Sequence, residues 1–197
     1  TVRRQLESLS VIYRTVHQAT FKTADGTTVV AKYDMLHVTP LMGPPAFISS
    51  SKLAEKASGY VEVDKETLQH VRYPNVFSCG DCSSLPTSKT AAAITVQAPV
   101  LVHNLLCAVE GGKGKAAYDG YTSCPIVTRR GGLILAEFKY GGALAETFNF
   151  PPFFDQGKEW MPFYYMKTIL FPWAYWNAMP QGRWYGTRTI FEPSFKK

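Results

Sequence analysis

The sequence predicts an α/β fold, built from short strands and one long helix. Three observations carry this prediction: two apolar runs at residues 126–128 and 133–138, an Ala-rich helical stretch from Thr90 to about Val109, and a hairpin pattern before residue 40. The runs are short and bounded by turn-forming or charged residues, which is typical of strands. The 46% hydrophobic content of the 197 residues is normal for a folded protein and argues against disorder.

The first forty residues are predicted to be rich in β-structure. Strand candidates lie at 9–13 and 16–21, followed by a turn at Asp25-Gly26 and a strand at 29–31 that pairs back. An Asp-Gly pair tolerates the positive φ angles that a tight hairpin needs. A buried strand is expected at 33–39. Because proline lacks the N–H that a ladder requires, the prolines at 40, 44 and 45 predict a domain boundary at residues 40–45.

The middle of the chain combines short strands with the helix. Alternating residues at 59–64 suit a half-exposed strand, and residues 75–77 suit a short buried strand. The helix is expected to begin at Ala91–Ala93 and to end at Gly111-Gly112. Pro99 lies inside this helix, so a kink or a break is expected there.

Charge and composition exclude several classes of protein. The net charge is +6, but Lys and Arg are scattered, so the sequence lacks the basic block of a nucleic-acid-binding protein. Four cysteines are too few for a small disulfide-rich scaffold. No run of 18 apolar residues occurs, so no transmembrane helix is expected. The sequence also lacks a P-loop, G-x-S-x-G and H-E-x-x-H.

A Gly80-Asp81 turn precedes the helix and has two interpretations. It is a common surface dipeptide, and it is also the pattern with which a flavin enzyme binds the ribityl chain. The glycine lets the backbone pass close to the flavin, the aspartate accepts hydrogen bonds from ribityl hydroxyls, and the following helix directs its N–H groups at the flavin edge. The candidate FAD contacts are Gly80, Asp81, Lys89, Thr90 and Ala91. Since no G-x-G-x-x-G occurs, we expect the chain to be the distal part of a larger flavoprotein.

Several motifs, in order along nearly the whole chain, carry a family resemblance. They include Tyr-Pro-Asn-Val-Phe at 73–77, Gly-Asp-Cys at 80–82, Leu-Pro-Thr-Ser-Lys-Thr-Ala-Ala-Ala at 85–93 and Tyr-Asp-Gly-Tyr-Thr-Ser-Cys-Pro at 118–125. Further stretches at 35–45, 63–70, 135–138, 146–148 and 175–177 continue the match. Together they strongly resemble mitochondrial sulfide:quinone oxidoreductase.

The resemblance implies the C-terminal part of a fold with two Rossmann-type domains, linked to FAD and NAD(P). Residues 1–45 would end the second, NAD-like domain. Residues 46–147 would form the returning part of the FAD-binding domain and carry a redox cysteine. Residues 148–197 would form an aromatic, amphipathic segment on the quinone side, at the membrane interface.

The resemblance also implies a reaction. Sulfide would be oxidised to a persulfide on a redox-active cysteine pair, FAD would pass the electrons to ubiquinone, and a small thiol or sulfite would accept the sulfane sulfur. Cys124 matches the distal cysteine of that pair, and its partner would lie upstream of Thr1. The fragment alone is therefore expected to be inactive. The implied location is the mitochondrial inner membrane, with peripheral or monotopic attachment.

The other cysteines leave an alternative open. Cys79 and Cys82 form a C-x-x-C, which suits a dithiol or half of a zinc site. A zinc site needs two more ligands and the sequence offers no second pair, so no metal site is expected. A C-x-x-C dithiol oxidoreductase remains the third hypothesis, after a truncated, non-catalytic membrane-interaction module. Cys107 is expected to be a core residue.

The stretch 157–186 is dense in Trp, Tyr, Phe and Met with interspersed cations. Such a segment suits an interfacial helix, with aromatic rings at the headgroup level, and equally an amphipathic helix packed on the core. The family resemblance favours the first, because a quinone must be collected from the bilayer. His37 and His70 are expected to be structural histidines.

Overall fold

The computed structural model describes residues 18–22, 25–34, 36–37, 39, 42–150 and 152–195. The chain divides into two compact units, residues 1–42 and 43–197, and each is treated separately here. The strand expected at 9–13 lies outside the described residues. The described residues form both helices and strands, which is consistent with the predicted α/β class.

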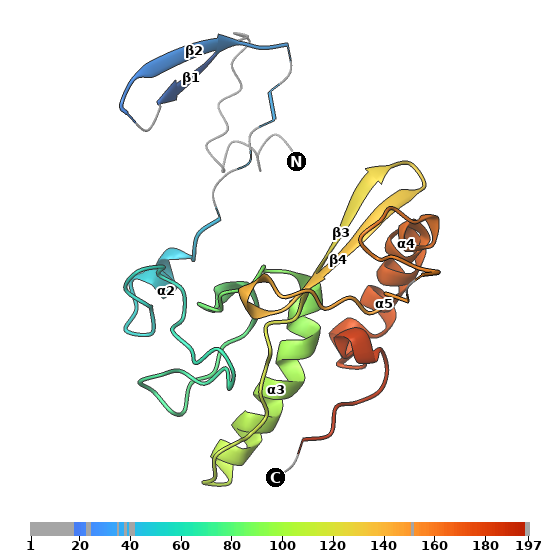
Figure 1. Cartoon of the computed structure of the whole chain (residues 1–197). Helices are drawn as coiled ribbons and strands as arrows, with labels where there is room; N and C mark the ends of the chain where they lie inside the picture. Colours follow the sequence, from blue (N-terminus) through green and yellow to red (C-terminus); the bar gives the residue numbers. More distant parts are fainter. Residues whose placement is uncertain are drawn as a thin grey trace. The chain divides into compact units, whose positions relative to one another are not determined.

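In the first unit, a two-stranded antiparallel hairpin is formed by β1 (Gln18–Lys22) and β2 (Thr28–Lys32) (Figure 1). Gly26 has φ +86° in the connecting turn, as the Asp-Gly pair predicted. The buried strand expected at 33–39 is wrong, because the described residues there are not in a strand and Leu36 is 41% exposed. Its residue types suit a strand, but the two-stranded sheet holds only β1 and β2.

In the second unit, the long helix α3 (Ala91–Val109) confirms the expected helix. It begins at Thr90, whose side chain accepts a hydrogen bond from the Ala93 N–H at 3.1 Å. It ends in a Schellman motif, in which Gly111, at φ +78°, and Gly112 donate to the carbonyls of Ala108 and Cys107. Pro99 does not break the helix, which is continuous across it.

By length and composition alone, α3 is apolar enough to cross a membrane. This is weak evidence, because core helices share the property. The buried polar residues of α3 bond to loops of the same unit: Gln97 accepts from the Gly80 N–H, and Asn104 donates to the carbonyls of Thr67 and Ala116. These bonds are those of a helix packed within a protein.

A second antiparallel hairpin is formed by β3 (Thr122–Arg129) and β4 (Gly132–Phe138). Both strands were predicted, and both are longer than the apolar runs that indicated them. Gly131 turns the chain at φ +80°, and the register shifts between Val127 and Arg129. Such a shift is the mark of a β-bulge, in which one strand contains an extra residue.

The stretch before α3 forms a short helix, α2 (Ala46–Ser49), and loops joined by isolated bridges. The strands expected at 59–64 and 75–77 are wrong as strands, since only single bridges form there, such as Gln69 with Phe77. The alternation at 59–64 is nevertheless confirmed in the burial of Val61 and Val63.

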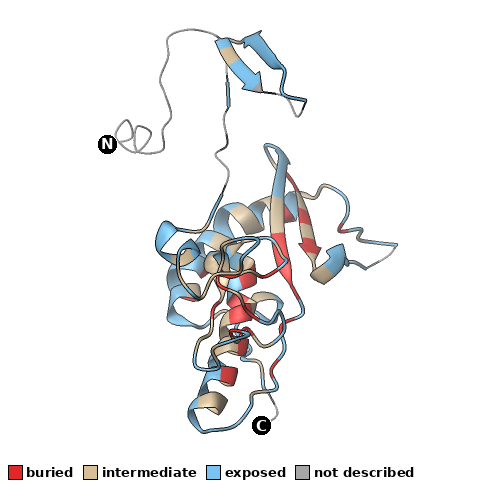
Figure 2. Ribbon diagram, turned by 90° about the vertical axis from the view of Figure 1, so that its left-hand side faces the viewer, coloured by how far each residue is buried: buried red, intermediate tan, exposed pale blue. Residues whose placement is uncertain are grey.

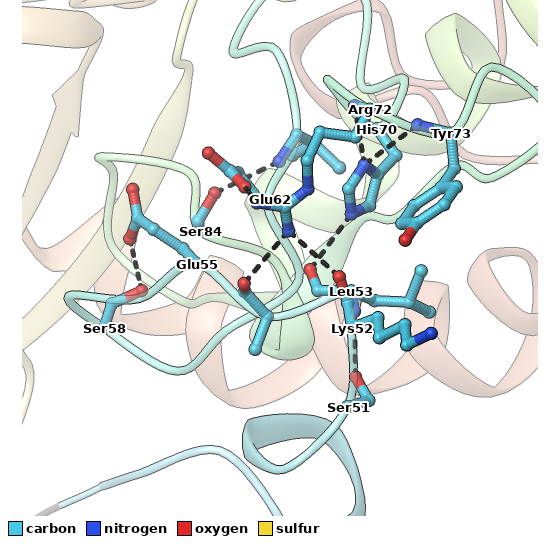
Figure 3. A network of polar contacts seen from close by, with 12 residues as sticks. Ser51, Lys52, Leu53, Glu55, Ser58, Glu62, His70, Arg72, Tyr73 and Ser84 are labelled. Carbon is cyan, nitrogen blue, oxygen red and sulfur yellow. Dashed lines mark hydrogen bonds and ion pairs between the residues drawn. The ribbon is translucent and has the colours of Figure 1, made fainter.

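A polar network fixes these loops (Figure 3). The His70 ring Nδ1 accepts from the backbone N–H of Arg72 at 3.0 Å, so its Nε2 carries the proton and donates to the Leu53 carbonyl at 3.1 Å. The Arg72 guanidinium pairs with Glu62 at 2.9 Å and donates to the carbonyls of Lys52 and Ala54. His70 is therefore a structural histidine, as expected.

The tail is helical from 161 to 177. It runs through α4 (Met161–Tyr165), a π-helical turn (Met166–Leu170) and α5 (Phe171–Asn177). Pro172 accounts for the π-turn. Its ring would clash with the carbonyl one helical turn earlier, and it has no N–H to donate to that carbonyl. A wider π-turn removes the clash and lets the carbonyl pair with a later N–H.

Two buried clusters hold the second unit together (Figure 2). The larger joins α3 to the loops and to the approach to β3, with Leu68, Val100 and Tyr118 almost fully buried. The smaller joins the second hairpin to α4 through Leu133, Leu135 and Phe163. The cysteine-bearing hairpin therefore lies between the long helix and the aromatic tail.

Candidate redox site

The Gly80–Cys82 turn is a short 3-10 helix held against α3. Gly80 has φ +70°, and a Cβ there would lie 3.2 Å from the Ile94 side chain, so both conformation and space favour glycine. Its N–H donates to the buried Gln97 Oε1 at 2.7 Å. The neighbouring Asp81 is exposed, and within the described part of the chain its carboxylate has no hydrogen-bond donor. It is therefore available to a ligand.

Lys89 is engaged within the protein. Its ammonium donates to the Ser83 carbonyl at 2.7 Å and lies 4.0 Å from the centre of the Tyr60 ring. Partial burial lowers the pKa of Lys89, although the charges of Asp81 and Cys82 oppose this. Gly80, Lys89 and Thr90 line a void of only about 10 Å³, which is too small to hold a flavin. The flavin contacts expected around Lys89 would therefore be made at the protein surface outside this void.

The N-terminus of α3 and Cys124 line the same cleft. Its volume is about 630 Å³, and its walls include Thr90, Ala91, Cys124 and residues of the second hairpin and the tail. Cys124 is half-buried in β3, opposite Ala136 of β4. Of the six residues expected to form the site, the structure brings three to this cleft and leaves Gly80, Asp81 and Lys89 beside it.

The cleft is largely apolar, and one cation in its wall binds the residue after the cysteine. The tail supplies Phe171, Tyr175 and Trp184 to its wall. The Lys167 ammonium donates to the carbonyl of Pro125, the residue after Cys124, at 3.0 Å. In the sequence, Lys167 was only one of several cations among aromatic residues, so its contact with Pro125 could not be foreseen.

A buried carboxylate in the same wall was also missed. Glu137 is 4% exposed and accepts four hydrogen bonds: from the Tyr121 hydroxyl at 2.5 Å, the Thr147 hydroxyl at 3.0 Å, the Thr147 N–H at 2.9 Å and the Gln156 amide at 2.7 Å. Four donors compensate for the water that burial removes. The only signal in the sequence was a glutamate inside an apolar strand.

The C-x-x-C pair is less suited to redox chemistry. Burial raises the pKa of Cys79, and the neighbouring Cys82 adds to the effect, whereas reactive cysteines need a lowered pKa. The Cys82 thiol donates to the Cys79 carbonyl at 3.3 Å. Among the described residues, no group of three His, Cys, Asp or Glu side chains could hold a metal.

A half-buried thiol in a largely apolar cleft, which the N-terminus of a helix also lines, is compatible with the thiol chemistry of an oxidoreductase. Comparison with known proteins shows which enzymes this chain is similar to. The relatives are mitochondrial sulfide:quinone oxidoreductases: one from Dictyostelium discoideum is 54% identical over 89% of this chain, one from Schizosaccharomyces pombe 50% over 90%, and one from Mus musculus 48% over 86%. This chain is a homologue of the C-terminal portion of these enzymes, as the motifs indicated.

The chain spans 38%, 39% and 37% of the lengths of these three relatives. No family model matches it. A chain in the cryo-EM structure of the Tetrahymena thermophila mitochondrial ATP synthase has a similar fold, with a TM-score of 0.70 and 24% identity over 98% of this chain and 46% of that one. At that identity, the likeness concerns the fold alone.

Proposed function

We propose that this chain supplies one redox cysteine and part of the FAD site of a mitochondrial sulfide:quinone oxidoreductase. The observation that carries the proposal is the cleft that Cys124 and the N-terminus of α3 both line. The homology to enzymes of that name supports it.

The described residues fit a flavin. Gly80 leaves room where a side chain would meet Ile94, and the exposed Asp81 carboxylate can accept hydrogen bonds from ribityl hydroxyls. The first turn of α3 offers backbone N–H groups at Ala91, where negative charge is stabilised. Bound FAD would accept two electrons at a time and release them to a quinone.

Cys124 would carry the sulfur chemistry. Hydrosulfide attacks a disulfide between Cys124 and a second cysteine outside this chain; one S–S bond forms as another breaks, leaving a persulfide and a thiolate. A small thiolate or sulfite then takes the sulfane sulfur and leaves the second thiolate. Re-forming the disulfide releases the two electrons of sulfide, which FAD would carry to ubiquinone. In this scheme Lys167, whose ammonium lies beside Pro125, contributes positive charge near the anionic sulfur.

The tail would attach the protein to the membrane. Met161, Tyr165, Ile169, Trp173 and Trp176 are spaced three or four residues apart and are all exposed by half or more. At that spacing they lie along one side of the helical segment. Such a stripe suits insertion at the acyl boundary, and insertion would bring the apolar cleft near the source of quinone at the inner mitochondrial membrane. It equally supports the second candidate, a membrane-interaction module without catalysis.

The test uses a chimera in which this chain replaces the matching part of the Dictyostelium relative, referred to below as the chimera. Purified chimera is expected to show the visible absorbance of bound oxidised flavin. Asp81→Ala should reduce the flavin content and Asp81→Asn should preserve part of it, because the amide oxygen still accepts hydrogen bonds. Glu110→Ala, at an exposed residue after α3, is the control. Full flavin content in Asp81→Ala would contradict the assignment of Asp81.

A further inference from the structure

A line of hydrogen bonds joins α3 to the strand that carries Cys124. The Ala93 N–H donates to Thr90 Oγ1 at 3.1 Å, Thr90 Oγ1 lies 2.9 Å from Thr122 Oγ1, and Thr122 Oγ1 donates to the Ser88 carbonyl at 3.3 Å. A hydroxyl has one proton to donate. Since a carbonyl can only accept, the Thr122 proton goes to Ser88, and Thr90 must donate to Thr122. Every donor in the line is thereby used.

Thr122 is buried and close to the cysteine in the strand. It is 2% exposed and begins β3, two residues before Cys124. Residues two apart in a strand point to the same face, so the hydroxyl of Thr122 and the thiol of Cys124 lie on the same side of the hairpin. That side is the one joined to the first turn of α3.

A second hydrogen bond reinforces the same junction. The Thr87 hydroxyl donates to the Gly120 carbonyl at 2.9 Å, just before β3. The loop that leads into α3 is thus bonded twice to the segment that leads into the cysteine strand. Of the two bonds, only the one through Thr122 also contains Thr90, the residue that caps the helix.

We propose that Thr122 is a positioning residue that holds Cys124 in register with the N-terminus of α3. This inference rests on the proposed function, because the register matters only where the thiol exchanges electrons with a flavin at that helix. Without the hydroxyl, the Thr90 proton and the Ser88 carbonyl lose their shared partner, and because both of these hydrogen bonds are part-buried, their loss costs free energy. The start of β3 shifts to relieve this, and the thiol moves with it.

The test separates the two halves of the reaction in the flavin-loaded chimera. Thr122→Val keeps the shape of the side chain and removes the hydroxyl, Thr122→Ser keeps the hydroxyl, and Thr67→Val removes a bond of the same kind, to Asp64 at 2.9 Å, away from the cleft. The measurements are flavin content, the rate at which sulfide bleaches the flavin, and the rate at which a soluble quinone reoxidises flavin that was reduced with dithionite.

Thr122→Val is expected to slow bleaching by sulfide about 10- to 100-fold, as misplacement of a reacting group does. Flavin content and reoxidation by quinone should be unchanged, Thr122→Ser should restore bleaching, and Thr67→Val should match the parent chimera. Thr122→Ala, which adds no bulk, replaces Thr122→Val if that variant does not fold.

Bleaching within about twofold of the parent would overturn the proposal. Equal slowing of both half-reactions, with flavin lost, would also overturn it, because that pattern indicates a merely structural role. If sulfide fails to bleach the flavin of the parent chimera, the proposed function fails, and this inference fails with it.

Discussion

The buried carboxylate of Glu137 shows how a single residue organises one wall of the cleft. It joins β4 to Tyr121, Thr147 and Gln156, three residues from different parts of the second unit. These three residues donate four hydrogen bonds, two to each carboxylate oxygen, which is the full set that a carboxylate with two accepting oxygens suits.

Glu137→Gln should destabilise the second unit. The NH₂ group of Gln has no acceptor at the Oε2 position, where both partners are N–H groups, so it must take the Oε1 position, where the two hydroxyls have to turn to accept. The loss of the negative charge also weakens all four hydrogen bonds. We expect a loss of about 1–3 kcal/mol in the free energy of unfolding, measured by denaturant titration. Glu66→Gln, at an exposed side chain, should change it by less than about 0.5 kcal/mol. A loss no larger than that of the control would show that the network does not stabilise the fold.

Tyr121 makes the stability of the folded protein depend on pH in the alkaline range. Burial, followed by the hydrogen bond to Glu137 and its negative charge, raises the pKa of Tyr121 above its ordinary value of 10.0. Above that pH the unfolded chain loses the phenolic proton and the folded protein keeps it, so the folded state binds more protons and stability falls as the pH rises. Tyr121→Phe should therefore make the loss of stability above pH 10 less steep.

Denaturant unfolding between neutral pH and strongly alkaline pH checks this, with the exposed Tyr165→Phe as control. An unchanged slope in Tyr121→Phe would count against the raised pKa. The variant should also be less stable than the parent at neutral pH, since Glu137 loses one donor.

Among the elements, α3 illustrates how much of a fold local sequence can specify. Its start at Thr90 and its end at Gly111 follow from capping chemistry within a few residues, and both were predicted. The continuity of the helix across Pro99 was not predicted, because this continuity depends on the packing around the proline and not on the proline alone.

The Schellman motif predicts a difference between two adjacent glycines. Gly111 has φ +78° with open space around its Cα, whereas Gly112 is outside the left-handed region and an added Cβ would make only ordinary contact. Gly111→Ala should lower the free energy of unfolding by about 1–2 kcal/mol, the cost of a left-handed conformation for a residue with a Cβ. Gly112→Ala should have the smaller effect. Equal effects in thermal or denaturant unfolding would refute a role for the positive φ angle.

At the scale of the whole molecule, the helical tail presents the exposed apolar stripe of the second unit. Replacing Ile169 and Trp176, which are 64% and 74% exposed, by Ser should weaken binding to vesicles that contain anionic lipid, because less apolar surface enters the acyl boundary. Flotation of the chain with such vesicles measures this. Val109→Ser, at a 77% exposed residue at the end of α3, controls for lost apolar surface elsewhere. Equal binding of all variants to the vesicles would show that the tail does not bind the membrane surface.

Sequence reasoning predicted the second hairpin and the long helix, each of which is indicated by residues close together in the chain. The redox role of Cys124 is indicated in the same way and stays a prediction. Sequence reasoning failed at 33–39 and 75–77, where the residue types suit a strand but a strand also needs a neighbour, which local sequence does not reveal. It also missed Thr122, Glu137 and Lys167. Their roles come from contacts with residues more than ten positions away, such as Thr90 and Pro125, which only the folded chain brings together.

The central claim is that Cys124 carries the sulfur chemistry of a sulfide:quinone oxidoreductase. Its most direct test is the rate of sulfide-driven quinone reduction by the flavin-loaded chimera with Cys124→Ala. The half-buried Cys107→Ala in α3 is the matched control. We expect Cys124→Ala to lower the rate at least about 100-fold, because the persulfide can no longer form on this residue, while Cys107→Ala keeps the parent rate. A Cys124→Ala chimera that reduces quinone at the parent rate would contradict the account.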